Sequence, residues 1–233
     1  MALNLSRRFP STVWNRTVSK WISLSQAGAR VAETHRDLAE NADVIFTMLK
    51  RSGEKILINT SSVSVTFSHP LAEEGRKAGA HFIEMPLSSS RSPAEQGELF
   101  EAVYRGAIGC GLKTKYAVNL YLITMTAGLT ELMALARAQG LDVEAFVQVL
   151  DAGPMASPYS KLKTAKMMSR NYEPQAAVKD CYKLTQLVLE AAKNADAQTP
   201  FVELCASLCQ RATAHQLGDR NMIALKNTRQ FYG

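Results

Sequence analysis

The pattern of apolar residues changes halfway along this chain of 233 residues, and that change constrains the fold more than any other feature. Up to about Leu99, short apolar runs of strand length alternate with short helical patterns. From about Gly111 onward, apolar residues recur at helical spacing, and almost no strand pattern is present. Strands that alternate with helices predict βαβ units and a parallel sheet. We therefore expect an α/β region at residues 1–108 and an all-α region at residues 109–233.

Polar residues follow three of the strands predicted in the first half. Strands are expected at residues 11–15, 42–49, 55–59 and 81–85, and helices at residues 1–8, 19–26, 35–41 and 70–78. The polar clusters at 15–17, 59–62 and 88–90 each come directly after a strand. Open parallel sheets bind ligands at the carboxyl ends of their strands. We therefore expect these clusters to lie along one ligand-binding edge.

The second half is dominated by one long helix, expected at residues 115–139. Its residues are apolar on most faces, which is typical of a helix buried between other elements. Further helices are expected at residues 143–150, 157–169, 175–194 and 199–218, with a last short one after Asp219. Asp142, Ser157 and Asp219 stand where N-caps are expected. The second half is therefore expected to hold about six helices.

Composition limits the partners of this chain. The net charge is +6, but its lysines and arginines are scattered and aromatic residues are only 7% of the chain, so we expect no nucleic-acid partner. No uninterrupted apolar run approaches the roughly 20 residues that cross a bilayer, so we expect no membrane. The four cysteines show no CxxC pair, so we expect buried thiols in a reducing, cytoplasmic setting and no metal. Residues 1–32 are basic and contain no acid, which keeps a mitochondrial location as the alternative.

An arginine follows the first predicted strand, within the cluster Asn15, Arg16 and Thr17. In a dinucleotide-binding sheet, an acid at such a place binds the ribose 2′-hydroxyl, whereas an arginine accommodates a 2′-phosphate. The cluster contains no acid, so any nicotinamide cofactor bound here is expected to be NADP rather than NAD. Taken alone, Arg16 is explained better as an ordinary surface residue.

A lysine and an asparagine share one face of the long helix. Lys115 and Asn119 are four residues apart in an apolar context. Desolvation lowers the pKa of a buried lysine toward the range that suits acid–base chemistry. A lysine whose head reaches solvent at the start of a helix explains Lys115 equally well.

Several short motifs, taken together, resemble a known family. They are TVWNRT, ADVIFTML, NTSSVS, FIEMPLSSS followed by PAEQGEL, KYAVN and KDCYKL, in this order along nearly the whole chain. The same order is found in the β-hydroxyacid dehydrogenases, which include 3-hydroxyisobutyrate dehydrogenase, 6-phosphogluconate dehydrogenase-like oxidoreductases and, more distantly, imine reductases. The resemblance implies an incomplete Rossmann-like parallel sheet, a helical domain with a long central helix, and a homodimer formed through that domain.

The resemblance also implies roles for individual residues. Lys115 corresponds to the catalytic lysine, the general acid and base for the substrate hydroxyl, and Asn119 to the residue that holds the substrate beside it. Ser88, Ser89 and Ser90 correspond to a loop that binds the substrate carboxylate. The residues implied in cofactor binding are Asn15, Arg16, Thr17, Met48, Leu49, Ser62 and Lys179.

The chain also departs from the family pattern. The family opens with a strand and a glycine loop, G-x-G-x-x-G, which places the pyrophosphate at a helix N-terminus. No such motif occurs here, and the chain is expected to be shortened at its start, between Leu49 and Lys55, and between Leu99 and Gly109. A sheet without its middle strand exposes hydrogen-bonding edges. Two glycines of the substrate loop are replaced by Ser89 and Ser90.

Two functions of different class are consistent with these features. The first is an NAD(P)-dependent oxidoreductase that transfers a hydride between nicotinamide and a small 3-hydroxy acid, with Lys115 moving the proton. The second is a truncated, non-catalytic relative that acts as a binding or dimerisation module. An imine reductase-like activity is a subordinate alternative, against which the retention of Lys115 argues mildly.

Overall fold

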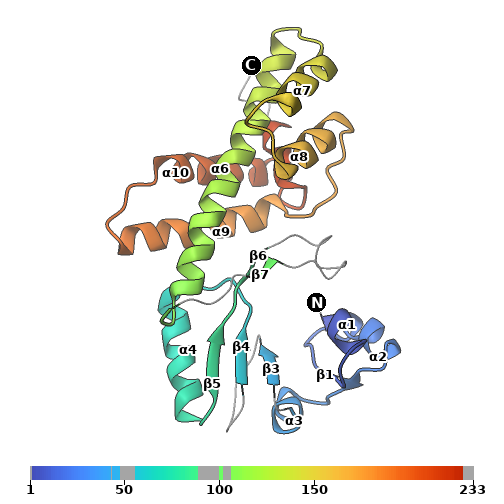
Figure 1. The fold of residues 1–233 in the computed structure, drawn as a ribbon, viewed down its shortest axis with the longest axis vertical. Coiled ribbons are helices and arrows are strands. Elements are labelled where there is room, and N and C mark those ends of the chain that lie inside the picture. Colours follow the sequence, from blue (N-terminus) through green and yellow to red (C-terminus); the bar gives the residue numbers. More distant parts are fainter. Residues whose placement is uncertain (1, 43, 48–55, 89–99, 102–105, 228–233) are drawn as a thin grey trace. The chain divides into compact units, whose positions relative to one another are not determined.

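The computed structural model describes residues 2–42, 44–47, 56–88, 100–101 and 106–227. The chain divides into two compact units, Met1–Lys115 and Tyr116–Gly233 (Figure 1). The division falls inside one long helix, whose first turns belong to the first unit. Each unit is described on its own below.

Parallel strands form the first unit. Strand β1 (Thr12–Val13) pairs with β2 (Arg30–Val31), and β3 (Val44–Thr47), β4 (Ile56–Asn59) and β5 (His81–Glu84) form a second sheet in the order β3-β4-β5. All of these pairs are parallel, as predicted, although β2 was not predicted and β1 is shorter than expected. Within the described residues, no ladder joins the two sheets.

The register of the larger sheet brings chemically different side chains into one row. Asn59 at the end of β4 lies opposite Glu84 at the end of β5. Because the strands are parallel, both residues stand at the carboxyl edge of the sheet, where ligands of such sheets bind. Behind this edge, Ala39, Ile45 and Leu57 form a small buried cluster.

Several short helices belong to the first unit. They are α1 (Ala2–Ser6), a 3-10 turn (Val18–Lys20), α2 (Ile22–Gln26), α3 (His35–Glu40) and α4 (Val65–Lys77). Ser64 caps α4 by accepting a hydrogen bond from the Phe67 amide, so the helix starts five residues before the predicted start. The prediction placed Pro70 in the first turn, whereas Pro70 lies inside α4. Helix α4 packs against β5 (Figure 1).

A short antiparallel pair follows the sheet. Strand β6 (Leu87–Ser88) pairs with β7 (Phe100–Glu101), so that Ser88 lies opposite Phe100. The candidate residues Met48, Leu49, Ser89 and Ser90 lie outside the described residues. The expected substrate loop is therefore described only at its first residue, by its backbone.

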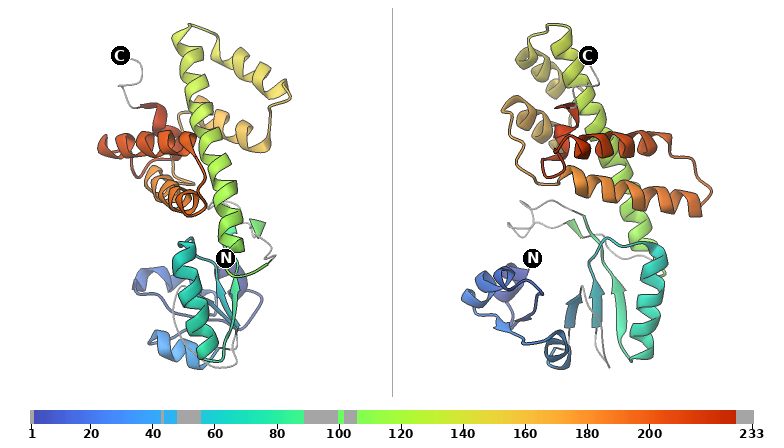
Figure 2. Two further views of the ribbon diagram at one scale, coloured as in Figure 1. Left: turned by 90° about the vertical axis from the view of Figure 1, so that its left-hand side faces the viewer. Right: turned by 180° about the vertical axis from the view of Figure 1, so that it is seen from behind.

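Helices build the second unit, as predicted. Helix α6 (Cys110–Ala138) enters it and is followed by α7 (Val143–Ala152), α8 (Pro158–Met168), α9 (Val178–Asn194), α10 (Pro200–Ala214) and a 3-10 helix (Met222–Asn227). Helices α9 and α10 pack side by side (Figure 2). The core gathers apolar side chains from α6, α9, α10 and the 3-10 helix, among them Ile123, Val178, Cys209 and Met222.

Helix α6 is long and apolar enough, by length and composition, to cross a membrane. The core helix of a globular unit passes the same test. Here Ile123, Leu129 and Met133 of α6 are buried in the clusters of the second unit. The packing of these side chains accounts for part of the apolar character of the helix, since Val118, Tyr121 and Leu135 on the same helix are exposed.

The predicted caps of the second unit are correct in two of three places. The Asp142 carboxylate accepts hydrogen bonds from the amides of Glu144 and Ala145, and Ser157 forms a capping box with Ser160. The prediction for Asp219 is wrong. Its carboxylate forms an ion pair with Lys179, and the last element is a 3-10 helix that begins at Met222.

A lysine is buried in the second unit without a carboxylate beside it in the described part of the chain. The Lys163 side chain on α8 is 3% exposed, and its ammonium lies 5.2 Å from the centre of the Tyr159 ring. Desolvation lowers the pKa of this lysine to about 8. The folded state therefore holds a charged group at a cost at neutral pH.

We expect Lys163→Met to stabilise the protein at pH 7 by up to about 3 kcal/mol, because each pKa unit is worth about 1.36 kcal/mol. The unfolded chain binds more protons between the folded pKa of about 8 and the ordinary value of 10.5. The free energy of unfolding of the unmodified protein therefore rises with pH across this window. The Lys163→Met variant lacks this pH-dependent change.

Urea denaturation at a series of pH values measures this difference. Lys161→Met on the exposed face of the same helix is the matched control and should change the unfolding free energy little. Equal stability of the two variants at pH 7 would contradict the prediction.

Candidate active site

The amine of Lys115 is buried in the first unit. Helix α6 carries this lysine in its second turn, and the residue is 8% exposed. Its Nζ donates a hydrogen bond to the Ser62 hydroxyl, with 2.5 Å between the two atoms. Burial lowers the pKa of the Lys115 amine from its ordinary value. The Lys115 side chain as a whole is therefore largely withdrawn from water.

Ser62 owes its place to the polar loop after β4. Asn59 ends the strand, and its side-chain oxygen accepts a hydrogen bond from the Ser61 amide at 3.1 Å. Two residues beyond Ser62, Ser64 begins α4. The Asn59 side-chain nitrogen is buried and has no hydrogen-bond partner among the described residues. Such a group is uncommon in a folded protein, and a bound ligand is one explanation for it.

Asn119 lies one helical turn beyond Lys115 on α6, so the two share a face of the helix. Its side chain is 6% exposed, and its nitrogen is also buried, without a hydrogen-bond partner in the part of the chain that the structure describes. The Asn119 side-chain nitrogen can therefore donate a hydrogen bond to a ligand. The helix therefore offers an amine and an amide at a fixed spacing.

The cluster after β1 is open to solvent. The Asn15 side chain accepts a hydrogen bond from the Thr17 amide at 2.9 Å, which closes a tight turn around Arg16. Arg16 is exposed, and no ion pair holds its guanidinium within the described ranges. A guanidinium in this state is suited to a phosphate group.

The other predicted residue, Lys179, lies in the second unit. It stands in the first turn of α9, as predicted, and is exposed. Its ammonium pairs with Asp219 rather than with the neighbouring Asp180, and this hydrogen bond raises the pKa of Lys179. Of the predicted site residues, the structure thus brings Lys115 and Ser62 into direct contact.

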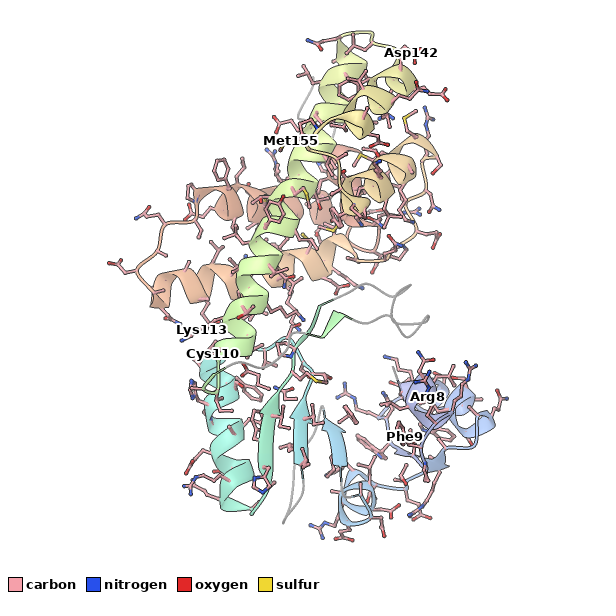
Figure 3. The ribbon with its side chains drawn as sticks, in the orientation of Figure 1. Arg8, Phe9, Cys110, Lys113, Asp142 and Met155 are labelled. Carbon is pink, nitrogen blue, oxygen red and sulfur yellow. The ribbon has the colours of Figure 1, made fainter. Side chains whose placement is uncertain are left out.

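Sequence reasoning assigned no role to Glu84, which is the most deeply buried acid of the described chain. The side chain is 0% exposed. Its carboxylate accepts hydrogen bonds from the Ser68 hydroxyl at 2.5 Å and from the amides of Gly109 and Leu112 at 3.1 and 2.9 Å. Figure 3 labels Cys110 and Lys113 in this turn of α6. Glu84 could have been found from the sequence as an acid at the end of an apolar strand.

These groups can bind and move a proton. Burial lowers the pKa of the Lys115 amine, which makes its proton easier to release, and the Ser62 hydroxyl lies beside it. The described residues contain no group of His, Cys, Asp or Glu side chains that could hold a metal. The Lys115 amine and the Ser62 hydroxyl together are suited to proton transfer to or from a bound ligand.

Family models match both halves of the chain. The model described as NAD-binding of NADP-dependent 3-hydroxyisobutyrate dehydrogenase matches residues 109–228, and the NAD binding domain of 6-phosphogluconate dehydrogenase matches residues 1–103. The solved structure of 3-hydroxyisobutyrate dehydrogenase from Mycobacterium tuberculosis, with L-serine, has a TM-score of 0.84 at 16% identity, and covers 97% of this chain and 93% of its own. The fold of this chain is therefore similar to that enzyme's.

Sequence comparison finds relatives of two kinds. Glyoxylate/succinic semialdehyde reductase 1 of Arabidopsis thaliana is 28% identical over 266 residues, which span 97% of this chain and 92% of the relative. That alignment is longer than the chain, so the relative has residues without counterparts here. The cytokine-like nuclear factor N-PAC of Aedes aegypti is 27% identical over 91% of this chain and 45% of its own length.

The order of the motifs, the fold and the matched models agree. The two models together span almost all of the chain, and the model of the helical half alone matches more than half of it. The chain belongs to the β-hydroxyacid dehydrogenase family, the NAD(P)-dependent oxidoreductases that include 3-hydroxyisobutyrate dehydrogenase.

Proposed function

We propose that this chain transfers a hydride between a nicotinamide cofactor and the hydroxyl-bearing carbon of a small 3-hydroxy acid or a related carbonyl compound. The observation that supports the proposal most is the buried Lys115 amine in contact with Ser62. A buried lysine is costly unless it has a function or a partner for its charge. In this family of oxidoreductases, a proton must move when the hydroxyl becomes a carbonyl.

The proton step follows from the state of the lysine. When the hydroxyl is oxidised, the neutral Lys115 amine accepts its proton; when the carbonyl is reduced, the ammonium donates one. Burial lowers the pKa of Lys115, which enlarges the neutral fraction available to accept a proton. The buried Asn119 amide donates to the substrate and holds its oxygen near the amine. The cofactor, when bound, supplies or removes the hydride.

The described residues fit the two ends of the cofactor. Arg16, Asn15 and Thr17 would hold the adenosine end, which favours NADP, and the unpartnered Asn59 amide and Ser62 would face the nicotinamide end. For the pyrophosphate, the chain contains no G-x-G-x-x-G, and α1 has only five residues.

Further features of the proposal concern the rest of the molecule. The serines at 88–90 would bind the substrate carboxylate, Met48 and Leu49 would lie beneath the adenosine, and Lys179 would lie near the nicotinamide. The chain is proposed to form a homodimer through its helical half and to act in the cytoplasm, with mitochondria as the alternative.

A second candidate is a binding module without catalysis. One relative carries the name of a nuclear factor rather than of an enzyme, which favours this candidate. The imine reductase-like alternative keeps the same fold, but Lys115 argues mildly against it. Cofactor binding and the effect of changing Lys115 separate these candidates.

We expect Lys115→Ala to lower kcat about 100-fold or more, because a positioned general acid or base typically contributes 10²–10⁴-fold. Glyoxylate and succinic semialdehyde, which the names of relatives mention, are suitable test substrates with NADPH, as is 3-hydroxyisobutyrate with NADP⁺. Lys113→Ala, an exposed lysine of the same helix, is the matched control and should retain activity. An active Lys115→Ala variant would refute the role of this lysine.

The pH dependence of the rate should have opposite signs in the two directions. Oxidation is expected to become faster as pH rises through the lowered pKa of Lys115, because the neutral amine is the acceptor. Reduction is expected to become slower over the same range, because the ammonium is the donor. Initial rates in both directions between pH 6 and 10.5 provide the measurement, and slopes of the same sign would contradict the assignment.

We expect NADPH to bind more tightly than NADH, and Arg16→Ala to remove most of that difference, because the guanidinium faces the 2′-phosphate. Isothermal titration calorimetry measures both affinities. Arg76→Ala is the control: Arg76 lies in the last turn of α4, at the opposite edge of the sheet, and pairs with Glu73 on the surface. If neither NADPH nor NADH binds at millimolar concentration, the oxidoreductase proposal is refuted and the non-catalytic binding module is the remaining candidate.

A further inference from the structure

The start of α6 lacks a cap of its own. The residue before the helix is Gly109, which has no side chain to accept a hydrogen bond, and its φ is +94°. The first amides of a helix need acceptors, and they form the positive end of its dipole. The Glu84 carboxylate, 25 residues earlier in the chain, supplies an acceptor for Gly109, and its other oxygen accepts from Leu112.

The same carboxylate also holds α4. The Ser68 hydroxyl donates to the oxygen that accepts from Gly109. All three partners are donors, which suits a carboxylate, since its two oxygens only accept when it is ionised. Strand β5, helix α4 and the start of α6 are therefore joined at one buried point.

The backbone of α6 fits tightly over this point. A Cβ added at Gly111 would lie 3.1 Å from a Glu84 carboxylate oxygen and 3.1 Å from Pro86. A Cβ added at Gly109 would lie 2.9 Å from Val65 of α4 and 3.3 Å from the imidazole nitrogen of His69. The two glycines let the helix start come within hydrogen-bonding distance of the carboxylate.

Lys115 follows Leu112 by one helical turn, and side chains on a helix lean toward its N-terminus. The Lys115 side chain therefore extends over the turn that Glu84 holds. The partner of its amine, Ser62, precedes α4 by three residues, and Glu84 holds α4 through Ser68. Both members of the Lys115–Ser62 contact are thus attached to elements that Glu84 joins.

We propose that Glu84 is a positioning residue: its carboxylate fixes the first turn of α6 against β5 and α4 and thereby keeps the Lys115 amine buried beside Ser62. Glu84 touches neither substrate nor cofactor in this scheme. Its importance for catalysis rests on the proposed function, whereas its effect on Lys115 does not.

The direction of a pKa change distinguishes positioning from a simple charge effect. Removing a negative charge near a lysine lowers the pKa of that lysine. Releasing the helix start would instead let water reach Lys115 and raise its pKa toward the ordinary value. The two explanations therefore predict opposite signs for a variant that lacks the carboxylate charge.

The experiment measures the pKa of Lys115 in the intact chain without substrate or cofactor. Competitive acetylation with acetic anhydride at a series of pH values, read by mass spectrometry, gives the pKa, with exposed Lys113 as the internal reference. The variants are Glu84→Gln, which keeps the side-chain volume, and Gly111→Ala, which keeps the charge but pushes against the carboxylate. Glu73→Gln, an exposed acid on α4, is the control.

We expect the pKa of Lys115 to rise by about one unit or more in both Glu84→Gln and Gly111→Ala, and to stay unchanged in Glu73→Gln. An unchanged or lower pKa in a folded Glu84→Gln protein would overturn the proposal. If Glu84→Gln does not fold, as judged by circular dichroism, Gly111→Ala decides with the same criteria.

Failure of the two proposals can be told apart. If the pKa rises in the variants but the unmodified chain shows no oxidoreductase activity, the positioning role stands and the proposed function fails. If the chain is active but the pKa of Lys115 is the same in the variants, the function stands and the role of Glu84 is refuted.

Discussion

A buried carboxylate joins the elements that surround the candidate catalytic lysine. Placing Glu84 entirely out of water costs several kcal/mol unless donors surround the charge. Here the donors are the Ser68 hydroxyl on α4 and two backbone amides at the start of α6, which is the positive end of a 29-residue helix. The strand, the α4 helix and the first turn of α6 must therefore come together for this residue to be buried.

Desolvation acts on two lysines in this protein with different consequences. Lys115 is buried against a serine hydroxyl at the carboxyl edge of a parallel sheet, where ligands of such sheets bind. Lys163 is buried over a tyrosine ring among the helices of the second unit. Burial lowers the pKa of the side-chain amine in both lysines. A lowered pKa alone therefore does not identify a catalytic lysine; the chemistry of its neighbours does.

Local patterns predicted the elements well where a cap or an apolar run was present. The strands that end at Asn59 and Glu84 and the helices capped by Asp142 and Ser157 were predicted from such signals. The predictions were wrong or incomplete where a tertiary partner decided the outcome. Pro70 suggested the beginning of a helix, but Ser64 begins it earlier, and Asp219 pairs with Lys179 instead of capping.

The candidate site shows the same limit. The sequence pointed to Lys115, Asn119 and Ser62. The structure adds that the Ser62 hydroxyl accepts a hydrogen bond from Lys115 and that the Asn119 nitrogen has no partner within the described ranges. Glu84 was visible only as an acid in an apolar strand, because its three donors lie 16 to 28 residues away along the chain.

The sequence by itself determined the order of the main helices and of strands β1, β3, β4 and β5, the parallel pairing of β3, β4 and β5, and the face that Lys115 and Asn119 share. These follow from residue periodicity and local hydrogen bonding, which act over a few residues. Only the tertiary structure decided which buried charges have partners, since burial depends on segments that are distant in the chain. The lowered pKa of Lys115 and the three donors around Glu84 are properties of that packing.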